Sequence, residues 1–105
     1  MPEKLKGYLG LAVRAGIASL GGSMALDHIR SGKSGVVLID AEASDNTRKK
    51  LRDACEYRRV RCHILPAGWI RAACGKGDWL AVSVAKGDLA DRISQLAEAE
   101  GTNQQ

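Results

Sequence analysis

The segment Gly35–Asp40, with its unbroken apolar run Val36-Val37-Leu38-Ile39, constrains the fold of this chain more than any other segment. An apolar run without polar alternation is typical of a strand that is buried on both faces of a sheet. Two more buried apolar strands are expected at Arg61–Leu65 and Leu80–Ala85, and a short strand at Ile17–Leu20. Strands of this kind require helices on both sides of the sheet.

Helices are predicted around these strands from apolar residues at helical spacing and from capping signals. We expect five, running from about Leu5 to Gly16, from Gly22 to Ser31, from a cap at Ser44 or Asp45 through Cys55, from Trp69 to Gly75, and from a cap at Asp88 to Glu100. This alternation predicts an α/β fold, a three-layer α/β/α sandwich around a small mixed sheet. Residues 1–100 are expected to form a single domain and residues 101–105 a flexible tail.

The positive net charge of the chain indicates which classes of partner it favours. A net charge of +4 over 105 residues favours polyanions through long-range attraction, although many basic proteins bind no nucleic acid. Aromatic residues make up only 4% of the chain and Phe is absent. A protein that reads single-stranded bases on aromatic platforms is therefore not expected.

Neither a membrane span nor a disulfide framework is indicated. No segment approaches the roughly 18 consecutive apolar residues that a span requires, and we expect a cytoplasmic protein with no membrane partner. Cys55, Cys62 and Cys74 lack Cys-x-x-Cys spacing. We expect them to be small buried apolar residues, with a metal site that adds His63 as the weaker alternative. No cofactor is expected.

Catalytic motifs find little support. Gly32-Lys33-Ser34 resembles the end of a phosphate-binding P-loop, but Asp27 stands where that motif needs a glycine, and the segment precedes a strand instead of following one. His28 and His63 are not paired in sequence with a nucleophile. We therefore expect no enzyme, and a hydrogen-bonded core histidine at His63.

The second predicted helix opens with Gly21-Gly22-Ser23-Met24, and Lys33 follows its end. A helix start leaves backbone N–H groups without partners and carries about half a positive charge, so it attracts phosphates and the acceptor edges of bases. Two adjacent glycines let a large anionic partner approach the backbone closely. An ordinary strand-to-helix turn uses the same glycines. This segment alone therefore does not distinguish a binding site for an anion from such a turn.

The cluster Arg48-Lys49-Lys50 lies in the first two turns of the third predicted helix. The helix dipole disfavours positive charge there by about 0.3–1 kcal/mol per residue. An anionic partner would offset that cost. The alternative is a solvated helix face that Asp45 and Asp53 partly neutralise.

Trp79 follows Gly75-Lys76-Gly77-Asp78 in the loop that enters the last strand. An indole in such a loop either stacks on a base or seals the edge of the core. Trp79 would share a surface with Gly21 and Gly22 only if the loop before the last strand converges with the turn that opens the second helix.

Several segments together resemble one family. They are Leu9-Gly10-Leu11-Ala12 with Arg14-Ala15-Gly16, Gly21 through Gly32-Lys33, Ala43-Ser44-Asp45-Asn46-Thr47 with its basic helix, and Cys55-Glu56-Tyr57. They are similar to the bacterial YlxQ-type branch of the kink-turn RNA-binding ribosomal proteins of the L-seven-Ae type, in order and spacing, from about Leu5 to Ile93. The resemblance implies an α/β/α sandwich that binds the sharply bent, G·A-paired internal loops of structured RNA without catalysis.

Members of that family read the kink with a Gly-x-Asn-Glu signature and a lysine three residues after the glutamate. In this chain Gly21 matches the signature, Gly22 fills its variable place, Ser23 and Met24 replace the Asn and Glu, and Asp27 replaces the lysine. A serine hydroxyl still donates or accepts a hydrogen bond, whereas a methionine accepts none from a guanine edge.

The resemblance also extends to the loop before the last strand. Gly77-Asp78-Trp79 matches the family segment that packs against the exposed nucleotide of the kink. The resemblance therefore implies RNA contacts at Asp78 and Trp79, with stacking on the indole worth about 1–3 kcal/mol per base.

The leading hypothesis is a monomeric, non-catalytic binder of structured RNA, either ribosomal or another RNA that contains a kink-turn. The expected phosphate contacts are Gly21, Gly22, Lys33, Arg48 and Lys49, and the expected base contacts are Ser23 and Trp79. The alternative is a protein-interaction adaptor on the same scaffold, since an exposed Met24 beside Trp79 would form an apolar patch.

Overall fold

The apolar run that dominates the sequence forms the centre of the sheet. In the computed structural model, which describes residues 1–75 and 77–101, strand β2 spans Ser34–Asp40 and every one of its residues is buried. Val36 and Leu38 belong to one buried cluster, and Val37 and Ile39 belong to the other. The side chains of a strand alternate between the two faces of a sheet, so β2 supplies both cores.

The sheet is mixed and its strands follow the order β1-β4-β2-β3. Strand β4 (Ala81–Ala85) pairs antiparallel with both β1 (Ala18–Leu20) and β2, whereas β3 (Arg61–Leu65) pairs parallel with β2. This arrangement confirms the predicted small mixed sheet.

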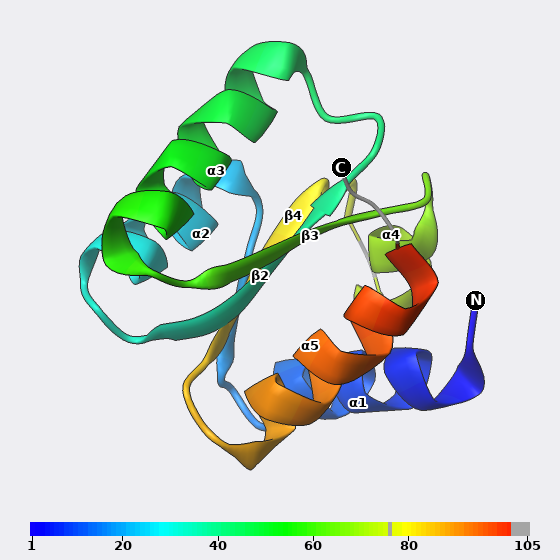
Figure 1. The fold of residues 1–105 in the computed structure, drawn as a ribbon. Helices are drawn as coiled ribbons and strands as arrows, with labels where there is room; N and C mark the ends of the chain where they lie inside the picture. Colours follow the sequence, from blue (N-terminus) through cyan, green and yellow to red (C-terminus); the bar gives the residue numbers. More distant parts are fainter. Residues whose placement is uncertain (76, 102–105) are drawn as a thin grey trace.

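Helices cover both faces of the sheet (Figure 1). Helices α2 (Gly22–Arg30) and α3 (Asp45–Arg58) lie on one face, and α1 (Glu3–Arg14), α4 (Trp69–Cys74) and α5 (Asp88–Gly101) lie on the other. The structure is therefore the predicted three-layer α/β/α sandwich.

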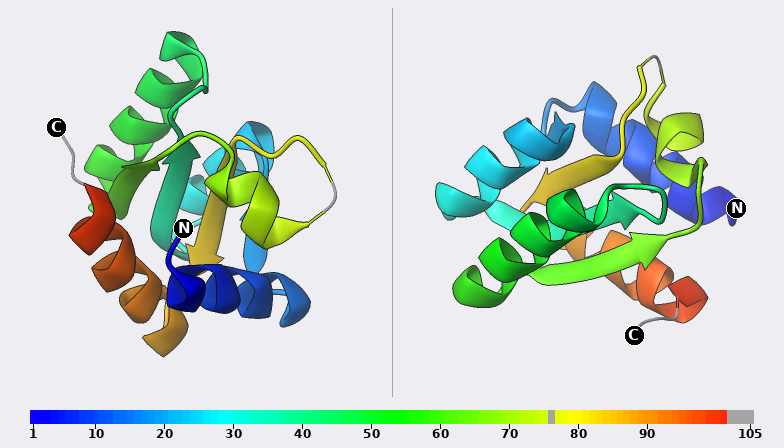
Figure 2. Two further views of the ribbon diagram at one scale, coloured as in Figure 1. Left: turned by 90° about the vertical axis from the view of Figure 1, so that its right-hand side faces the viewer. Right: turned by 90° about the horizontal axis from the view of Figure 1, so that it is seen from above.

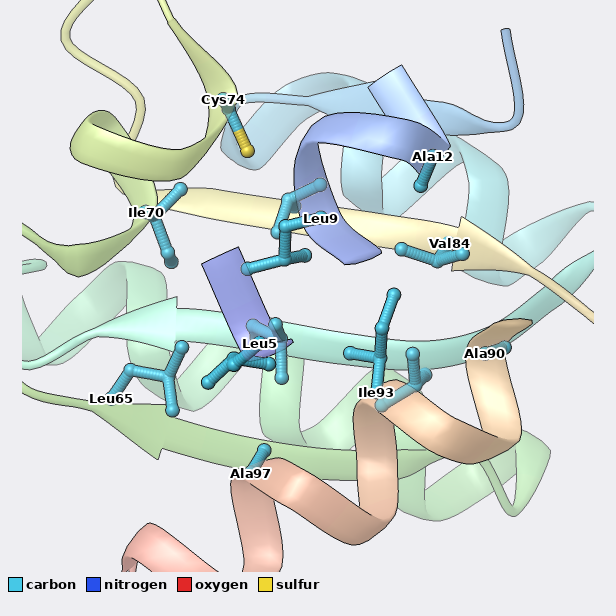
Figure 3. Packing of buried hydrophobic residues seen from close by; sticks show 13 residues of the cluster. Leu5, Leu9, Ala12, Leu65, Ile70, Cys74, Val84, Ala90, Ile93 and Ala97 are labelled. Atoms are coloured by element: carbon cyan, nitrogen blue, oxygen red, sulfur yellow. The ribbon is translucent and has the colours of Figure 1, made fainter. Parts of the chain in front are cut away.

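The larger core lies between the sheet and the layer formed by α1, α4 and α5 (Figure 3). Leu5 and Leu9 of α1, Ile70 of α4 and Ile93 of α5 all point into it and are fully buried. Burying one such side chain stabilises the fold by about 1.5–3 kcal/mol, so three helices from separate parts of the chain are fixed to one surface.

The structure departs from the sequence-based expectation at one strand and at two helix ends. Strand β3 was expected to be buried on both faces, but it is the edge strand, and within it only Leu65 is buried. Asp88 is the first residue of α5, because the carbonyl of Gly87 accepts the helical hydrogen bond from Asp91 at 3.1 Å. Helix α5 continues to Gly101, and residues 102–105 of the predicted tail lie outside the described residues.

Candidate nucleic-acid interface

Helix α2 begins with a glycine in a conformation that other residues rarely adopt. Gly21, at the N-cap position, has φ 91° and ψ 158°, and its N–H donates to the carbonyl of Ala81 at 2.8 Å. This bond ties the start of α2 to the first residue of β4. A side chain at Gly21 would be strained whatever space surrounds it, because its φ lies in the region that favours glycine.

The loop that precedes β4 converges on this glycine. A Cβ built on Gly21 would lie 3.6 Å from Cε3 and Cζ3 of the Trp79 ring, and one built on Gly77 would lie 2.5–2.7 Å from Cε2, Cζ2 and Nε1 of the same ring. The indole therefore lies against the backbone of both glycines. Figure 2 shows the loop into β4 passing beside the start of α2. Trp79 also packs against the larger core, so it seals the core edge.

The first turn of α3 completes the same corner. A Cβ on Gly22 would lie 3.5 Å from Cγ2 of Thr47, which places α3 beside the start of α2. The Oγ of Ser44 accepts a hydrogen bond from the N–H of Thr47 at 3.1 Å, so Ser44 is the helix cap, as one of the two predicted candidates. The sequence analysis assigned Thr47 no site role of its own. Its position three residues after the capping Ser44 places it in the first turn of α3.

The opening of α2 presents positive potential to solvent. Among the described residues, no side chain caps this helix, and its first turn contains no acidic residue. Ser23 and Met24 are both exposed, and Met24 retains 57% of its accessible surface. The positive end of the helix dipole is therefore not neutralised by the helix itself.

Arg48 and Lys49 follow Thr47 in α3, line the hollow between α3 and β3, and form ion pairs within their own helix. Arg48 pairs with Asp45 and donates to the carbonyl of Ala41 at 3.0 Å, and Lys49 pairs with Asp53 at 2.8 Å. A hydrogen bond from Lys49 to Asp53 and the attraction between their charges raise the pKa of Lys49. Exposed pairs of this kind contribute about 0–1 kcal/mol, so an incoming phosphate can compete for both cations.

Two predicted site residues lie away from the corner. Lys33 follows the other end of α2, where its carbonyl accepts a hydrogen bond from the N–H of Lys86 at 3.0 Å. Nine helical residues separate the two ends by about 13 Å. Asp27 is exposed in the second half of α2. The structure therefore brings Gly21, Gly22 and Trp79 together, and it does not bring Lys33 to them.

Asp78 takes part in an ion-pair group that sequence reasoning did not identify. Arg71 lies 3.5 Å from the Asp78 carboxylate, 3.2 Å from that of Glu42 and 4.0 Å from that of the buried Asp40. Asp40 in turn accepts hydrogen bonds from the N–H groups of Glu42 at 2.7 Å and Gly68 at 2.9 Å. This group joins the loops at the end of β2 to the one that carries Trp79.

Both histidines are hydrogen-bonded to serines. His28 Nδ1 lies 2.6 Å from Ser83 Oγ, which is fully buried and donates to Ser34 Oγ at 2.7 Å. His63 Nε2 lies 2.8 Å from Ser94 Oγ. Burial lowers the pKa of each histidine. These contacts satisfy polar groups between the sheet and the helices, as expected at His63.

The described part of the chain offers neither a metal site nor a membrane-spanning helix. No group of three or more His, Cys, Asp or Glu side chains there could hold a metal ion. None of the helices there has the length and apolar character needed to cross a membrane.

Comparison with known proteins gives two kinds of match, while no family model matches the chain. RNA-binding protein YlxQ of Enterococcus faecium is 37% identical over 63 residues, which cover 60% of this chain and 61% of that protein. RNA-binding protein YlxQ of Bacillus subtilis (strain 168) is 40% identical over 52 residues, which cover 50% and 52%. The chain thus spans about three fifths and one half of these relatives. The matches confirm the resemblance to YlxQ proteins.

Solved structures match over nearly the whole chain. A Bacillus halodurans protein of unknown function superposes with a TM-score of 0.86 at 22% identity, covering 92% of this chain and 99% of that one. A Giardia lamblia 15.5 kD RNA-binding protein gives a TM-score of 0.72 at 22% identity, covering 94% and 92%. Both solved structures therefore share the three-layer fold of this chain.

Proposed function

We propose that this chain binds structured RNA, of the kink-turn type, at the corner where α2, α3 and the loop before β4 meet. One observation carries the proposal: Trp79 lies against Gly21 at a helix start that no described side chain caps. A positive helix end beside an aromatic ring offers one site for a phosphate and one for a base. The names of the YlxQ relatives, which are RNA-binding proteins, support the same reading.

The phosphate contacts are the backbone of Gly21 and Gly22 together with Arg48 and Lys49. The two glycines let the RNA backbone approach the helix start, because neither carries a side chain. The two cations are the next two residues of α3 after Thr47, whose Cγ2 would lie 3.5 Å from a Cβ on Gly22. An RNA phosphate that displaces Asp45 or Asp53 forms a charge-assisted hydrogen bond of its own.

The base contacts are Ser23 and the Trp79 ring. Trp79 is half-buried, so it serves both the core and the surface. Asp78 acts through its pair with Arg71, which holds the loop in place. Lys33 and Asp27 contact the RNA only if the RNA extends along α2 beyond the corner. The protein works without catalysis, as a cytoplasmic monomer on ribosomal or similar RNA.

The test is binding to a panel of a kink-turn duplex, a three-way junction and a plain duplex, measured by fluorescence anisotropy at low salt. We expect the kink-turn to bind tightest, and Ser23→Asn/Met24→Glu to tighten that complex alone. Equal binding to all three RNAs would contradict kink-turn recognition, and no binding to any would contradict the proposal.

A second candidate is a protein-interaction adaptor, which the 57% exposure of Met24 favours. Exposed methionine is common on surfaces that bind proteins. Affinity purification with and without ribonuclease separates the two functions: a partner that persists after digestion supports the adaptor, and one that is lost supports RNA binding.

A further inference from the structure

Two cysteines from different layers meet at the open side of the α3 layer. Cys55 of α3 and Cys62 of β3 lie close enough that each shifts the pKa of the other. Both line one hollow of about 630 Å³ between the helix and the edge strand. Both also pack in the smaller core. The third cysteine, Cys74, belongs to the core on the opposite face of the sheet.

The chain between the two thiols holds them in this position. Helix α3 ends at Arg58, and Arg59 takes the left-handed conformation, with φ 59° and ψ 43°. The next residue, Val60, donates its N–H to the carbonyl of Cys55 at 2.8 Å. This turn sends the chain straight back along the helix, so the second residue of β3 lies under the last buried residue of α3.

The two thiols differ in access and in acidity. Cys55 retains 1% of its accessible surface, whereas Cys62 is half-buried at the hollow. The neighbouring Cys55 and the charge of Arg52 lower the pKa of Cys62 against the effect of burial. The neighbouring Cys62, with burial, raises the pKa of Cys55. Because Cys62 opens onto the hollow, an oxidant reaches its thiol first, and Cys55 is placed beside it to resolve the oxidised form.

We infer that Cys55 and Cys62 form a reversible disulfide when the protein meets a hydroperoxide. The Cys62 thiolate attacks a peroxide oxygen, so an S–O bond forms while the O–O bond breaks and an alkoxide or hydroxide leaves. Cys55 gives its proton to that base and attacks the Cys62 sulfur. The S–S bond then forms, the S–O bond breaks, and hydroxide leaves and takes up a proton as water. Two thiols are oxidised by two electrons and the peroxide is reduced.

This inference does not rest on RNA binding, and the unmodified chain tests it. The purified protein is treated with equimolar hydrogen peroxide, and its intact mass is measured before and after treatment with dithiothreitol. We expect the mass of two hydrogens to be lost and then restored. Trypsin separates the thiols onto residues 53–58, 62–71 and 72–76. The oxidised digest should contain the first two peptides linked.

Cys74→Ala is the matched control, because burial raises the pKa of that thiol to about 11. It should keep the bridge, whereas Cys55→Ala and Cys62→Ala should lose it, with circular dichroism to confirm that each variant folds. A bridge that involves Cys74, a dimer linked through Cys62, or a Cys62 sulfinic acid beside a free Cys55 would overturn the inference. So would an unchanged mass.

Discussion

At the scale of single residues, Gly22 separates binding from folding. It lies in the first position of α2, and an added Cβ would meet only Thr47 Cγ2, at an ordinary 3.5 Å. Gly21 and Gly77 differ, because both have positive φ and both lie against the Trp79 ring. The three glycines therefore have different roles: Gly22 keeps the surface open, Gly21 supplies the positive φ at the helix start, and Gly77 leaves room for the indole.

Gly22→Asp should weaken binding of a kink-turn RNA by about tenfold or more, because its carboxylate repels phosphate at the helix start. The same charge should leave the melting temperature unchanged or raise it, since an acidic residue at a helix N-terminus stabilises by about 0.3–1 kcal/mol. Anisotropy titration and thermal melting measure the two effects. Gly22→Ala is the control, and equal affinity of the two variants would contradict the prediction.

Gly77→Ala should reduce the free energy of unfolding by about 2–4 kcal/mol, from left-handed strain together with displacement of the indole. The matched variant is Gly75→Ala, since Gly75 also has positive φ but no atom of the described residues lies within 4 Å of its added Cβ. It should lose only the strain, about 1–2 kcal/mol. Urea unfolding compares them, and equal losses would show that the ring does not depend on Gly77.

At the scale of elements, α3 carries residues of both proposed sites, the RNA interface and the cysteine pair. Its first two turns carry Arg48 and Lys49, and its last turns carry the thiol that lies beside β3. Arg48 and Lys49 each have a carboxylate partner on their own helix, so their positive charges are balanced within α3.

Arg48→Ala and Lys49→Ala should each weaken RNA binding and lower the slope of log affinity against log salt by about one unit. The effect should be the same for every RNA, because phosphate contacts carry no sequence information. Arg92→Ala is the control, since α5 lies on the opposite face of the sheet. Titrations at several salt concentrations measure the slope, and an unchanged slope in both α3 variants would remove these residues from the interface.

Elements were predictable from sequence where periodicity and capping agree. The Val36–Ile39 run predicts a buried strand, and the cap at Ser44 marks the start of α3. The edge position of β3 was not predictable, because it depends on the strand order and not on the residues within the strand. The approach of Trp79 to Gly21 also depends on how the strands pair. These two residues are 58 positions apart in sequence, and they meet because β1 pairs with β4.

At the scale of the whole molecule, a histidine–serine bond ties each helical layer to the sheet. His28 joins α2 to Ser83 of β4, and His63 of β3 joins Ser94 of α5. Burial lowers the pKa of both imidazoles, so the folded state favours their neutral forms.

The free energy of unfolding should therefore fall as pH falls. A lowered folded pKa means that the unfolded chain binds protons first, so stability is full above the unfolded pKa of about 6.5 and declines below it. Urea unfolding from about pH 8 to about pH 5.5 measures the decline. His63→Gln should make it shallower. A curve that stays flat in the unmodified protein would show that the histidines are not the linked groups.

The central claim is that folded RNA docks at the start of α2. The most direct test is an NMR titration of the labelled protein with a kink-turn RNA at low salt. We expect shifts at the amides of Gly21, Gly22 and Ser23 and at the indole N–H of Trp79, with α1 and α5 unaffected. Shifts confined to the α1 and α5 face, or none at saturating RNA, would contradict it.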